Sequence, residues 1–423
     1  MHPAMKFLHA ADLHIDSPLR GLSAYEGAPV EQIRGATRRA VENLVDAAIS
    51  HGVDLVVIAG DVFDGDWKDY STGLFWIAQL ARLEATRIPV VFVAGNHDAA
   101  SEISRRLRLP PNVTQLSSAK PETKRFDDLN VAVVGQGYST KAVSADLAAA
   151  YPLADPGLFT IGLLHTSLDG RPNHASYAPT TIDTLRSRGY QYWGLGHVHQ
   201  REAVLTDPWV VFPGTLQGRH ARELGSKGAS LVTVEGDSVR SVEHLSLDVV
   251  RWHESHVNAT ELESVDDVLA AVSRSLDSVV ATSADRLVVA RVRITGRSPA
   301  HAELWRDAAA VEAEIRALGA RTGAVWVEKI TVATHRAVEL TERGEDDTIG
   351  AIAARVKAVR LNPAALAEYE NVFTALRNKI AADARSGESA AFDTTSLGST
   401  AHIAETLDAS VELIQSLLEE TDE

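Results

Sequence analysis

The sequence predicts an α/β fold, in which a large first domain is followed by a smaller α/β domain and by a helical C-terminal region. Three observations lead to this prediction. Short apolar runs are each followed by a polar motif, strand-like and helix-like patterns alternate after residue 250, and the chain from about Ala337 is rich in Ala and Leu. Alternation of strands with helices is typical of α/β proteins.

Five apolar runs are the predicted strands of the first domain. They cover Met5–Ala10, Leu55–Ala59, Val90–Ala94, Phe159–Leu164 and Tyr190–Leu195. In open α/β sheets, ligands bind outside the carboxyl ends of the strands, because the loops there are free to carry functional side chains. We therefore expect the polar motifs that follow these strands to converge on one rim.

The polar motifs form an ordered set of metal-ligand candidates. In chain order they are Asp12-Leu13-His14, Gly60-Asp61, Gly95-Asn96-His97-Asp98, His165 and Gly196-His197-Val198-His199. Alternate residues of an extended segment point to the same side, so we expect the first and last motifs each to offer two ligands to one ion. Carboxylate, carboxamide and imidazole ligands suit Mn²⁺, Fe²⁺ or Zn²⁺, whereas a structural zinc site favours Cys, which this chain lacks.

Two divalent ions about 3.5–4 Å apart can hold a phosphoryl group, activate water at neutral pH and stabilise the leaving oxygen. Such a pair needs a bridging ligand, for which Asp61 is the candidate. Taken singly, an Asp or Asn after a strand is more often a helix cap or a turn residue, and a lone His a structural one. The fixed order of five motifs, each behind an apolar run, favours the metal site.

With these motifs the chain resembles the calcineurin-like metallophosphoesterases, and within them the bacterial DNA repair exonuclease branch of SbcD-like and YhaO-like nuclease subunits. The resemblance is carried further by Phe7–His14, by Ala59–Asp64 and by Phe212-Pro213-Gly214-Thr215. It covers about residues 5–250. It implies a two-sheet sandwich flanked by helices.

The resemblance also assigns roles to the motif residues. One metal ion would be held by Asp12, His14, Asp61 and His199. The other would be held by Asp61, Asn96, His165 and His197. His97 would face the scissile phosphate as a general acid or transition-state stabiliser, and Asp98 would orient that loop.

Asp64 stands where archaeal and eukaryotic relatives carry a histidine. Bacterial relatives also have Asp there, so the metal site is not affected, but the polarity of exonuclease cleavage cannot be transferred from the eukaryotic members. The segment Asp64-Gly65-Asp66 also lacks the Asp-Arg-Gly of protein serine/threonine phosphatases, which argues against that class.

The composition fits a cytoplasmic enzyme, because the chain has no Cys, no signal-peptide pattern and no apolar stretch long enough to span a membrane. The net charge of −16 opposes tight DNA binding by the protein alone. Residues 1–250 hold 23 basic and 28 acidic side chains, and residues 251–423 hold 18 and 29, so most of the excess acid lies in the second part. Arg38-Arg39 and Arg105–Arg108 are either local basic patches or solvated helix faces.

A change of pattern places the end of the first domain near residue 250. Gly228–Glu235 and Val239–Ser246 predict a hairpin about Gly236-Asp237. The strands that follow are predicted at Val249–Val257, Leu287–Thr295 and Ala324–Ala333, with helices at Glu261–Leu276 and Ala300–Leu318. By the order of its elements this βαβαβ module, residues 251–336, resembles the capping domain of the nuclease family, which implies that it would position DNA.

Residues 337–423 predict three helices, the last over Ala401–Leu418. From Thr400 to Glu423 the chain carries seven acids and no Lys or Arg, with apolar residues at helical spacing. This segment either folds back or docks on a partner. By resemblance the partner would be an ABC-type, SMC-like ATPase, and this chain carries no phosphate-binding loop of its own. A homodimer also remains open.

The sequence thus predicts a Mn²⁺-dependent DNA phosphodiesterase, the nuclease subunit of a repair complex with that ATPase. A phosphodiesterase or phosphatase for a small molecule is the first alternative, since an acidic surface tolerates such a substrate better. A non-catalytic scaffold is the second, and the complete ligand set counts against it. Among the other histidines, His9 and His51 are predicted to be structural, and His220 to lie where it could touch substrate.

Overall fold

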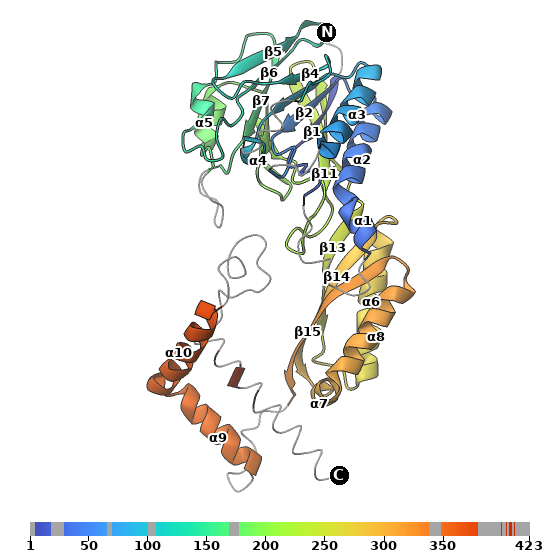
Figure 1. Ribbon diagram of the computed structural model, residues 1–423, viewed down its shortest axis with the longest axis vertical. Coiled ribbons are helices and arrows are strands. Elements are labelled where there is room, and N and C mark those ends of the chain that lie inside the picture. The colour runs from blue at the N-terminus through green and yellow to red at the C-terminus, as the bar shows by residue number, and fades with distance from the viewer. Residues whose placement is uncertain are drawn as a thin grey trace. The chain divides into compact units, whose positions relative to one another are not determined.

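The computed structural model describes residues 5–17, 29–65, 70–99, 107–168, 177–337 and 348–379, together with residues 399, 403, 406, 407 and 410. The described chain divides into two compact units, one ending at Trp252 and one beginning at His253. Each unit is described here by itself (Figure 1).

A six-stranded sheet carries the first three motifs. Its strands, in spatial order, are β12 (Ser238–Ser246), β11 (Gly228–Glu235), β1 (Met5–Ala10), β2 (Leu55–Ala59), β3 (Val90–Val93) and β4 (Val113–Gln115). The strands from β1 to β4 are parallel, and β11 joins β1 antiparallel. The predicted motif strands and the predicted hairpin are confirmed here, whereas β4 was not predicted.

A second six-stranded sheet carries the last two motifs. Its order is β5 (Glu122–Phe126), β6 (Val131–Gly135), β7 (Phe159–His165), β8 (Tyr192–Gly196), β10 (Trp209–Phe212) and β9 (Glu202–Thr206). The four inner strands are parallel and both edge strands are antiparallel. Only β7 and β8 were predicted from the sequence. The five motif strands are therefore divided between two sheets.

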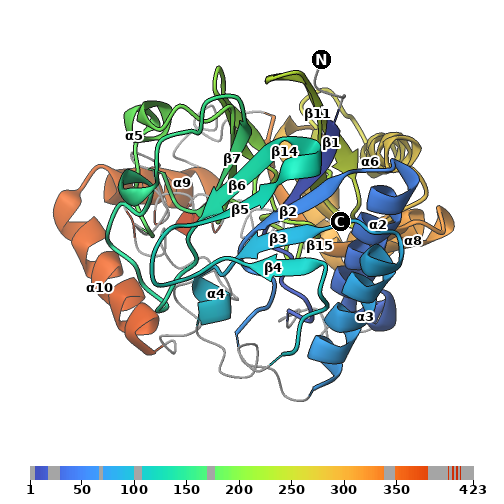
Figure 2. The ribbon, with the colours of Figure 1, turned by 90° about the horizontal axis from the view of Figure 1, so that it is seen from above.

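Apolar side chains fill the space between the two sheets. Phe7 and Val57 of the first sheet share one buried cluster with Ile161, Leu163 and Tyr192 of the second. The outer face of the first sheet packs against α2 (Ala36–Ser50) and α3 (Ser71–Ala85), and that of the second against α5 (Ile182–Ser187). Figures 1 and 2 show α2 and α3 on the opposite side of the sheets from α5. Because both faces of each motif strand are buried, its sequence is an almost continuous apolar run. The predicted α/β fold with two sheets flanked by helices is confirmed.

The second unit contains the predicted βαβαβ order. Its elements are β13 (Val250–Asn258), which begins in the first unit, α6 (Val265–Thr282), β14 (Leu287–Ser298), α7 (His301–Arg306), α8 (Ala308–Arg321) and β15 (Val325–Arg336). The sheet order is β13-β14-β15. One predicted helix, Ala300–Leu318, is divided into α7 and α8 at Asp307, whose side chain accepts a hydrogen bond from Ala310 N at 2.9 Å and caps α8.

The sheet of the second unit has two different faces. Val288, Val292 and Ile330 belong to the face that packs under the helices, which lie along one side of this sheet (Figure 1). Strand alternation places the cations on the other face, which we call the basic face. Its members are Arg291, Arg293, Arg297, Lys329 and His335.

Two helices follow in the second unit, α9 (Thr348–Arg360) and α10 (Pro363–Lys379). They are separated at Leu361-Asn362, and Asn362 Oδ1 accepts a hydrogen bond from Ala364 N at 3.0 Å. The third predicted helix, Ala401–Leu418, lies almost entirely outside the described residues. Among the described residues, none of the helices has the length and apolar character needed to cross a membrane.

Candidate metal centre

The five polar motifs meet at the carboxyl ends of strands from both sheets. Asp12 and His14 follow β1, Asp61 follows β2, and Asn96, His97 and Asp98 lie in α4 (Asn96–Ala99), directly after β3. His165 is the last residue of β7, and His197 and His199 follow β8. Asp12, His14, Asp61 and His165 are at most 2% exposed. The predicted residues are thus brought to one rim.

The first group of potential ligands contains Asp12, His14 and His199, whose ligand atoms all lie within 4.8 Å of one another. His14 Nε2 and His199 Nε2 are 3.3 Å apart, and His199 Nε2 is 3.9 Å from Asp12 Oδ1. Two imidazole nitrogens and a carboxylate oxygen converge here. This donor set suits a divalent cation.

The second group is built around His165. Its Nδ1 lies 2.9 Å from the carbonyl oxygen of Ala59, and its Nε2 lies 3.0 Å from Asn96 Oδ1 and 3.4 Å from Asp61 Oδ2. With Nδ1–H donated to the carbonyl, a neutral ring presents a lone pair to two oxygens. Three acceptors would then face one another, and a bound cation satisfies all three. The residues present therefore fit a divalent metal ion.

Asp12 and His197 connect the two groups. The Asp12 carboxylate lies within 4.8 Å of Asp61 and His165 as well as of its own group, and it accepts a hydrogen bond from His197 N at 3.0 Å. The ring of His197 lies edge-on to that of His165, with centroids 5.3 Å apart. Asp12 is thus the carboxylate common to both groups, while a bridging role for Asp61 remains a prediction.

The electrostatics of the rim favour added positive charge. Burial, together with the charge of Arg219, lowers the pKa of His14 to about 3. The ring is therefore neutral and can donate an electron pair to a metal ion. Burial also disfavours charge on His165, but the neighbouring Asp61 carboxylate outweighs it and raises the His165 pKa to about 9. Despite burial, the same contact keeps the pKa of Asp61 well below its usual range. A cation, whether a proton or a metal ion, is stabilised between these groups.

Several ligand candidates adopt left-handed backbone conformations. The φ angles are 51° for Asp12, 44° for His14, 50° for Asp61 and 95° for His197. The expected extended backbone was therefore wrong for both motifs. His197 and His199 also lie with different groups, His197 beside His165 and His199 with Asp12 and His14. The loop of Asp12 and His14 is instead hydrogen-bonded to the next motif, from Asp12 N to Gly60 O and from His14 N to Asp61 O, both at 3.0 Å. Such strained conformations are concentrated at functional sites.

The motif glycines are needed because the loops pack closely together. A Cβ on Gly95 would lie 2.2 Å from Asp61 Oδ1, and a Cβ on Gly196 would lie 1.9 Å from the carbonyl oxygen of Ala59. Any side chain at these positions would displace a ligand candidate or its support. The glycines before Asn96 and His197 are thus needed for the close packing of the site.

His97 lies beside the ligand groups and is held by Asp64. The two side chains approach to 2.8 Å, from His97 Nδ1 to Asp64 Oδ1, and Asp64 also accepts a hydrogen bond from Ser17 Oγ at 2.8 Å. The side chain of His97 is 34% exposed, in contrast to the buried Asp12, His14, Asp61 and His165. Burial alone would lower the pKa of His97. The hydrogen bond to Asp64 and the nearby carboxylate charges outweigh burial, so the pKa of His97 is raised above its usual value. Asp64 therefore orients His97, a role that sequence reasoning did not assign.

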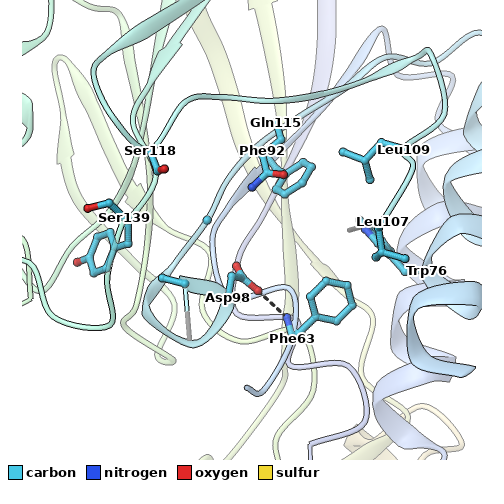
Figure 3. Close-up of a pocket in the computed structure, with 12 residues that line it drawn as sticks. Phe63, Trp76, Phe92, Asp98, Leu107, Leu109, Gln115, Ser118 and Ser139 are labelled. Atoms are coloured by element: carbon cyan, nitrogen blue, oxygen red, sulfur yellow. Dashed lines mark hydrogen bonds between the residues drawn. The ribbon is translucent and has the colours of Figure 1, made fainter. Parts of the chain in front are cut away.

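Asp98 holds two motif loops together. Its Oδ1 accepts a hydrogen bond from Phe63 N at 2.9 Å, which Figure 3 shows as a dashed line. Its Oδ2 accepts from Gly95 N at 3.0 Å and from Val62 N at 3.2 Å. The carboxylate also borders a cavity of about 390 Å³, which Trp76 and Phe92 help to line. Asp98 thus links the loops after β2 and β3 by hydrogen bonds, and its part in catalysis stays a prediction.

Two functional candidates were missed by the sequence analysis. Glu223 Oε1 lies 2.6 Å from His199 Nδ1, and Arg219 lies between Glu223 and Asp64. Both belong to the polar segment 217–223, which follows the Pro213-Gly214 turn. The alternating charges of this segment were the sequence feature that could have indicated a functional role. His220, which was expected near substrate, lies 3.6 Å from Glu223 Oε1.

Other sequence candidates have structural roles. His9 is fully buried between the sheets, where its Nδ1 lies 2.9 Å from the hydroxyl of Tyr192. His51 is the C-cap of α2. Arg38, proposed as part of a basic patch, pairs with Asp16 at 2.5 Å. Arg105 and Arg106 lie outside the described residues.

Two family models match the chain. Residues 5–201 match the calcineurin-like phosphoesterase model, which covers the five motifs. Residues 252–335 match a model described as the middle domain of the metallophosphoesterase YhaO. The second match corresponds to the sheet and helices of the second unit.

Curated relatives point in the same direction. The chain is 36% identical over 265 residues to a protein of Bacillus subtilis named "Uncharacterized metallophosphoesterase YhaO", covering 62% of this chain and 65% of the relative. Two archaeal proteins named "DNA double-strand break repair protein Mre11" are more distant. The protein from Methanopyrus kandleri is 26% identical, over 50% of this chain and 48% of its own length. The protein from Sulfurisphaera tokodaii is 23% identical, over 61% of this chain and 66% of its own length.

The match covers less than two thirds of the length of each of these relatives. The calcineurin-like family model, over residues 5–201, includes all five polar motifs and the strands and loops that form the rim. On the residues, their geometry and these matches, the chain belongs to the calcineurin-like metallophosphoesterases, and its rim gathers side chains that could hold divalent metal ions.

Proposed function

We propose that this protein is a Mn²⁺-dependent phosphodiesterase that cleaves DNA. The observation that carries the proposal is the position of His97, held by Asp64 through a 2.8 Å contact beside two groups of metal-ligand candidates. Bound divalent ions would supply charge stabilisation for the phosphoryl group and an activated water molecule. The names of the Mre11 relatives support DNA as the substrate.

His97 is the residue that assists the leaving oxygen. Because Nδ1 contacts Asp64, Nε2 is the nitrogen that remains for the substrate. An imidazolium at this position donates a proton to the departing oxygen, and the Asp64 carboxylate fixes the ring and stabilises its charge. Five ligand candidates are buried and the His199 side chain is 20% exposed, so His97, at 34%, is more accessible than these.

The basic face supports a polyanionic substrate. Arg293, Arg297 and Lys329 are exposed on it, in a chain whose net charge is −16. Guanidinium groups spaced along a strand can contact successive backbone phosphates without reading the bases. The face gives the acidic protein a local surface on which DNA can lie.

We also propose that the C-terminal region binds an ABC-type ATPase. Leu361, Tyr369 and Val372, in and just before α10, are 76%, 41% and 66% exposed. A helical segment with exposed apolar residues suits docking on a partner helix. Removal of residues 337–423 should then abolish co-purification with an ATPase encoded nearby, while cleavage of a small diester by the remaining chain persists.

A substrate panel tests the proposed activity. Linear duplex DNA, a cyclic nucleotide and a chromogenic diester are each incubated with the full chain and Mn²⁺, with and without EDTA. We expect cleavage of DNA that EDTA abolishes. Cleavage of only the cyclic nucleotide would favour the second candidate, a small-molecule phosphodiesterase, which the net charge of −16 would suit. Full activity in EDTA would contradict both.

A further inference from the structure

Glu223 makes a close carboxylate contact with a ligand candidate. Its Oε1 lies 2.6 Å from His199 Nδ1, while the other ring nitrogen, Nε2, lies 3.3 Å from His14 Nε2. The ring of His199 is therefore fixed from one side by a carboxylate and presents its second nitrogen to Asp12 and His14. This is the arrangement by which carboxylates orient metal-binding histidines and make them better donors.

The other ligand histidines are supported differently. His165 contacts a neutral backbone carbonyl, that of Ala59, through its Nδ1. His14 Nδ1 is buried without a hydrogen-bond partner, and the nearest carboxylate oxygen, Asp64 Oδ1, is 3.5 Å away. Among these three rings, His199 has the closest carboxylate, at 2.6 Å, compared with 3.4 Å from His165 to Asp61 and 3.5 Å from His14 to Asp64. The support of the two ligand groups is thus unequal.

Glu223 is itself rigidly placed. Its side chain is 5% exposed, and its Oε2 accepts a hydrogen bond from the backbone N–H of Arg219 at 2.6 Å. The Arg219 guanidinium lies 3.4 Å from Oε1 and 3.8 Å from Asp64 Oδ1. These contacts hold the carboxylate in one position, and its contact with Nδ1 fixes the orientation of the His199 ring.

We propose that Glu223 is a positioning residue that selectively strengthens the metal site of Asp12, His14 and His199. The site of Asp61, Asn96 and His165 does not depend on it, because His165 takes its orientation from a backbone carbonyl. The inference rests on the proposed two-metal centre. It adds that the two ions are held unequally and that the polar segment 217–223 controls one of them.

Titration of the metal-free full chain with Mn²⁺ by calorimetry, with metal analysis of the loaded protein, tests the proposal. Wild type should bind two ions. In Glu223→Gln, the amide oxygen can still accept from Arg219 N–H, so the loop is retained. We expect the Kd of one ion to rise about 10- to 100-fold and that of the other to stay unchanged. The matched control is Glu235→Gln, at the exposed end of β11, which should leave both unchanged.

A double-mutant comparison separates positioning from general stability. In a His199→Ala background, Glu223→Gln should cause no further loss of Mn²⁺ binding, because it acts through the missing ring. Unchanged affinities in Glu223→Gln, equal weakening of both ions, or a full additional loss in the His199→Ala background would overturn the proposal. If wild type bound two ions and cleaved DNA in these cases, the proposed function would stand. Fewer than two ions in wild type would overturn both.

Discussion

Two histidines of the rim are each held by a carboxylate outside the predicted ligand set. Asp64 contacts His97 at 2.8 Å, and Glu223 contacts His199 at 2.6 Å. The two carboxylate–histidine contacts have different roles. His199 lies among the metal-ligand candidates, whereas His97 is the more exposed ring. Arg219 lies near both carboxylates and connects the two pairs.

The role of His97 gives the first prediction. His97→Ala should keep two bound Mn²⁺ ions and lower the single-turnover rate of cleavage by about 10²- to 10⁴-fold, because general acid assistance acts in the transition state and not in coordination. Metal analysis beside rapid-quench kinetics measures both quantities. His51→Ala, at the exposed end of α2, is the control. Loss of an ion in His97→Ala would make His97 a ligand and contradict the assigned role.

At the scale of elements, the loops after β2 and β3 depend on glycine. The second prediction is that Gly95→Ala sharply reduces Mn²⁺ binding, because its Cβ would lie 2.2 Å from Asp61 Oδ1. Gly65→Ala is the matched control, since that position has a φ of 79° but nothing within 4 Å of the added Cβ. It should cost only about 1 kcal/mol of stability. Calorimetric titration measures the Mn²⁺ affinities of the two variants, and thermal unfolding measures their stabilities. Equal Mn²⁺ affinities for Gly95→Ala and Gly65→Ala would disprove the close-packing argument.

The third prediction concerns the pH dependence of the second unit. His301, the first residue of α7, is 3% exposed, and its Nδ1 lies 3.0 Å from Thr334 Oγ1. Burial, aided by the charges of Arg336 and His335, lowers its pKa from 6.5 to about 4. Between these values the unfolded chain binds a proton that the folded chain does not. The contribution to stability is therefore full above pH 6.5 and lost as the pH falls towards 4.

Thermal unfolding of the full chain at a series of pH values checks this prediction. The transition of the second unit should move down between pH 7 and pH 4.5 by several degrees more in wild type than in His301→Gln. His256→Gln, at a side chain that is 62% exposed, should behave as wild type. Parallel pH curves for wild type and His301→Gln would rule out His301 as the source.

The sequence predicts the buried elements of this fold better than its edges. The strands β1 and β2 are long apolar runs because both of their faces are covered, and their predicted bounds agree with the structure. Edge strands such as β5, Glu-Thr-Lys-Arg-Phe, have no such pattern because one side meets solvent. The break at Asp307 between α7 and α8 lies within one continuous helical pattern, so its position could not be predicted from periodicity.

The site residues that belong to short local motifs could be predicted from the sequence. Asp12, Asp61 and His165 follow apolar runs directly, so their meeting follows from strand order. The contact of Glu223 with His199 joins residues 24 positions apart through a loop without a repeating pattern. The left-handed backbone at Asp12 likewise results from hydrogen bonds to Gly60, not from its own sequence. Such long-range contacts carry no signal in a single sequence.

For the whole molecule, the distribution of charge decides how an acidic protein meets DNA. The fourth prediction is that Arg293→Gln/Arg297→Gln weakens DNA binding and reduces the slope of log K against log salt by about 1 to 2, since each lost phosphate contact removes about 0.9. Arg274→Gln/Arg321→Gln makes the same charge change on α6 and α8 and should have little effect. Fluorescence anisotropy at several salt concentrations measures the slopes. Equal slopes for the two double variants would exclude the basic face as the DNA surface.

The division of the motif strands between two sheets has a mechanical consequence. Asp12 and His14 belong to the first sheet and His199 to the second, so an ion in that group would cross-link the two layers. The second group likewise joins Asp61 to His165 across the same seam. Ions bound there would oppose sliding or separation of the layers and raise resistance to unfolding. The concentration of divalent metal ions around the protein would then affect its stability as well as its chemistry.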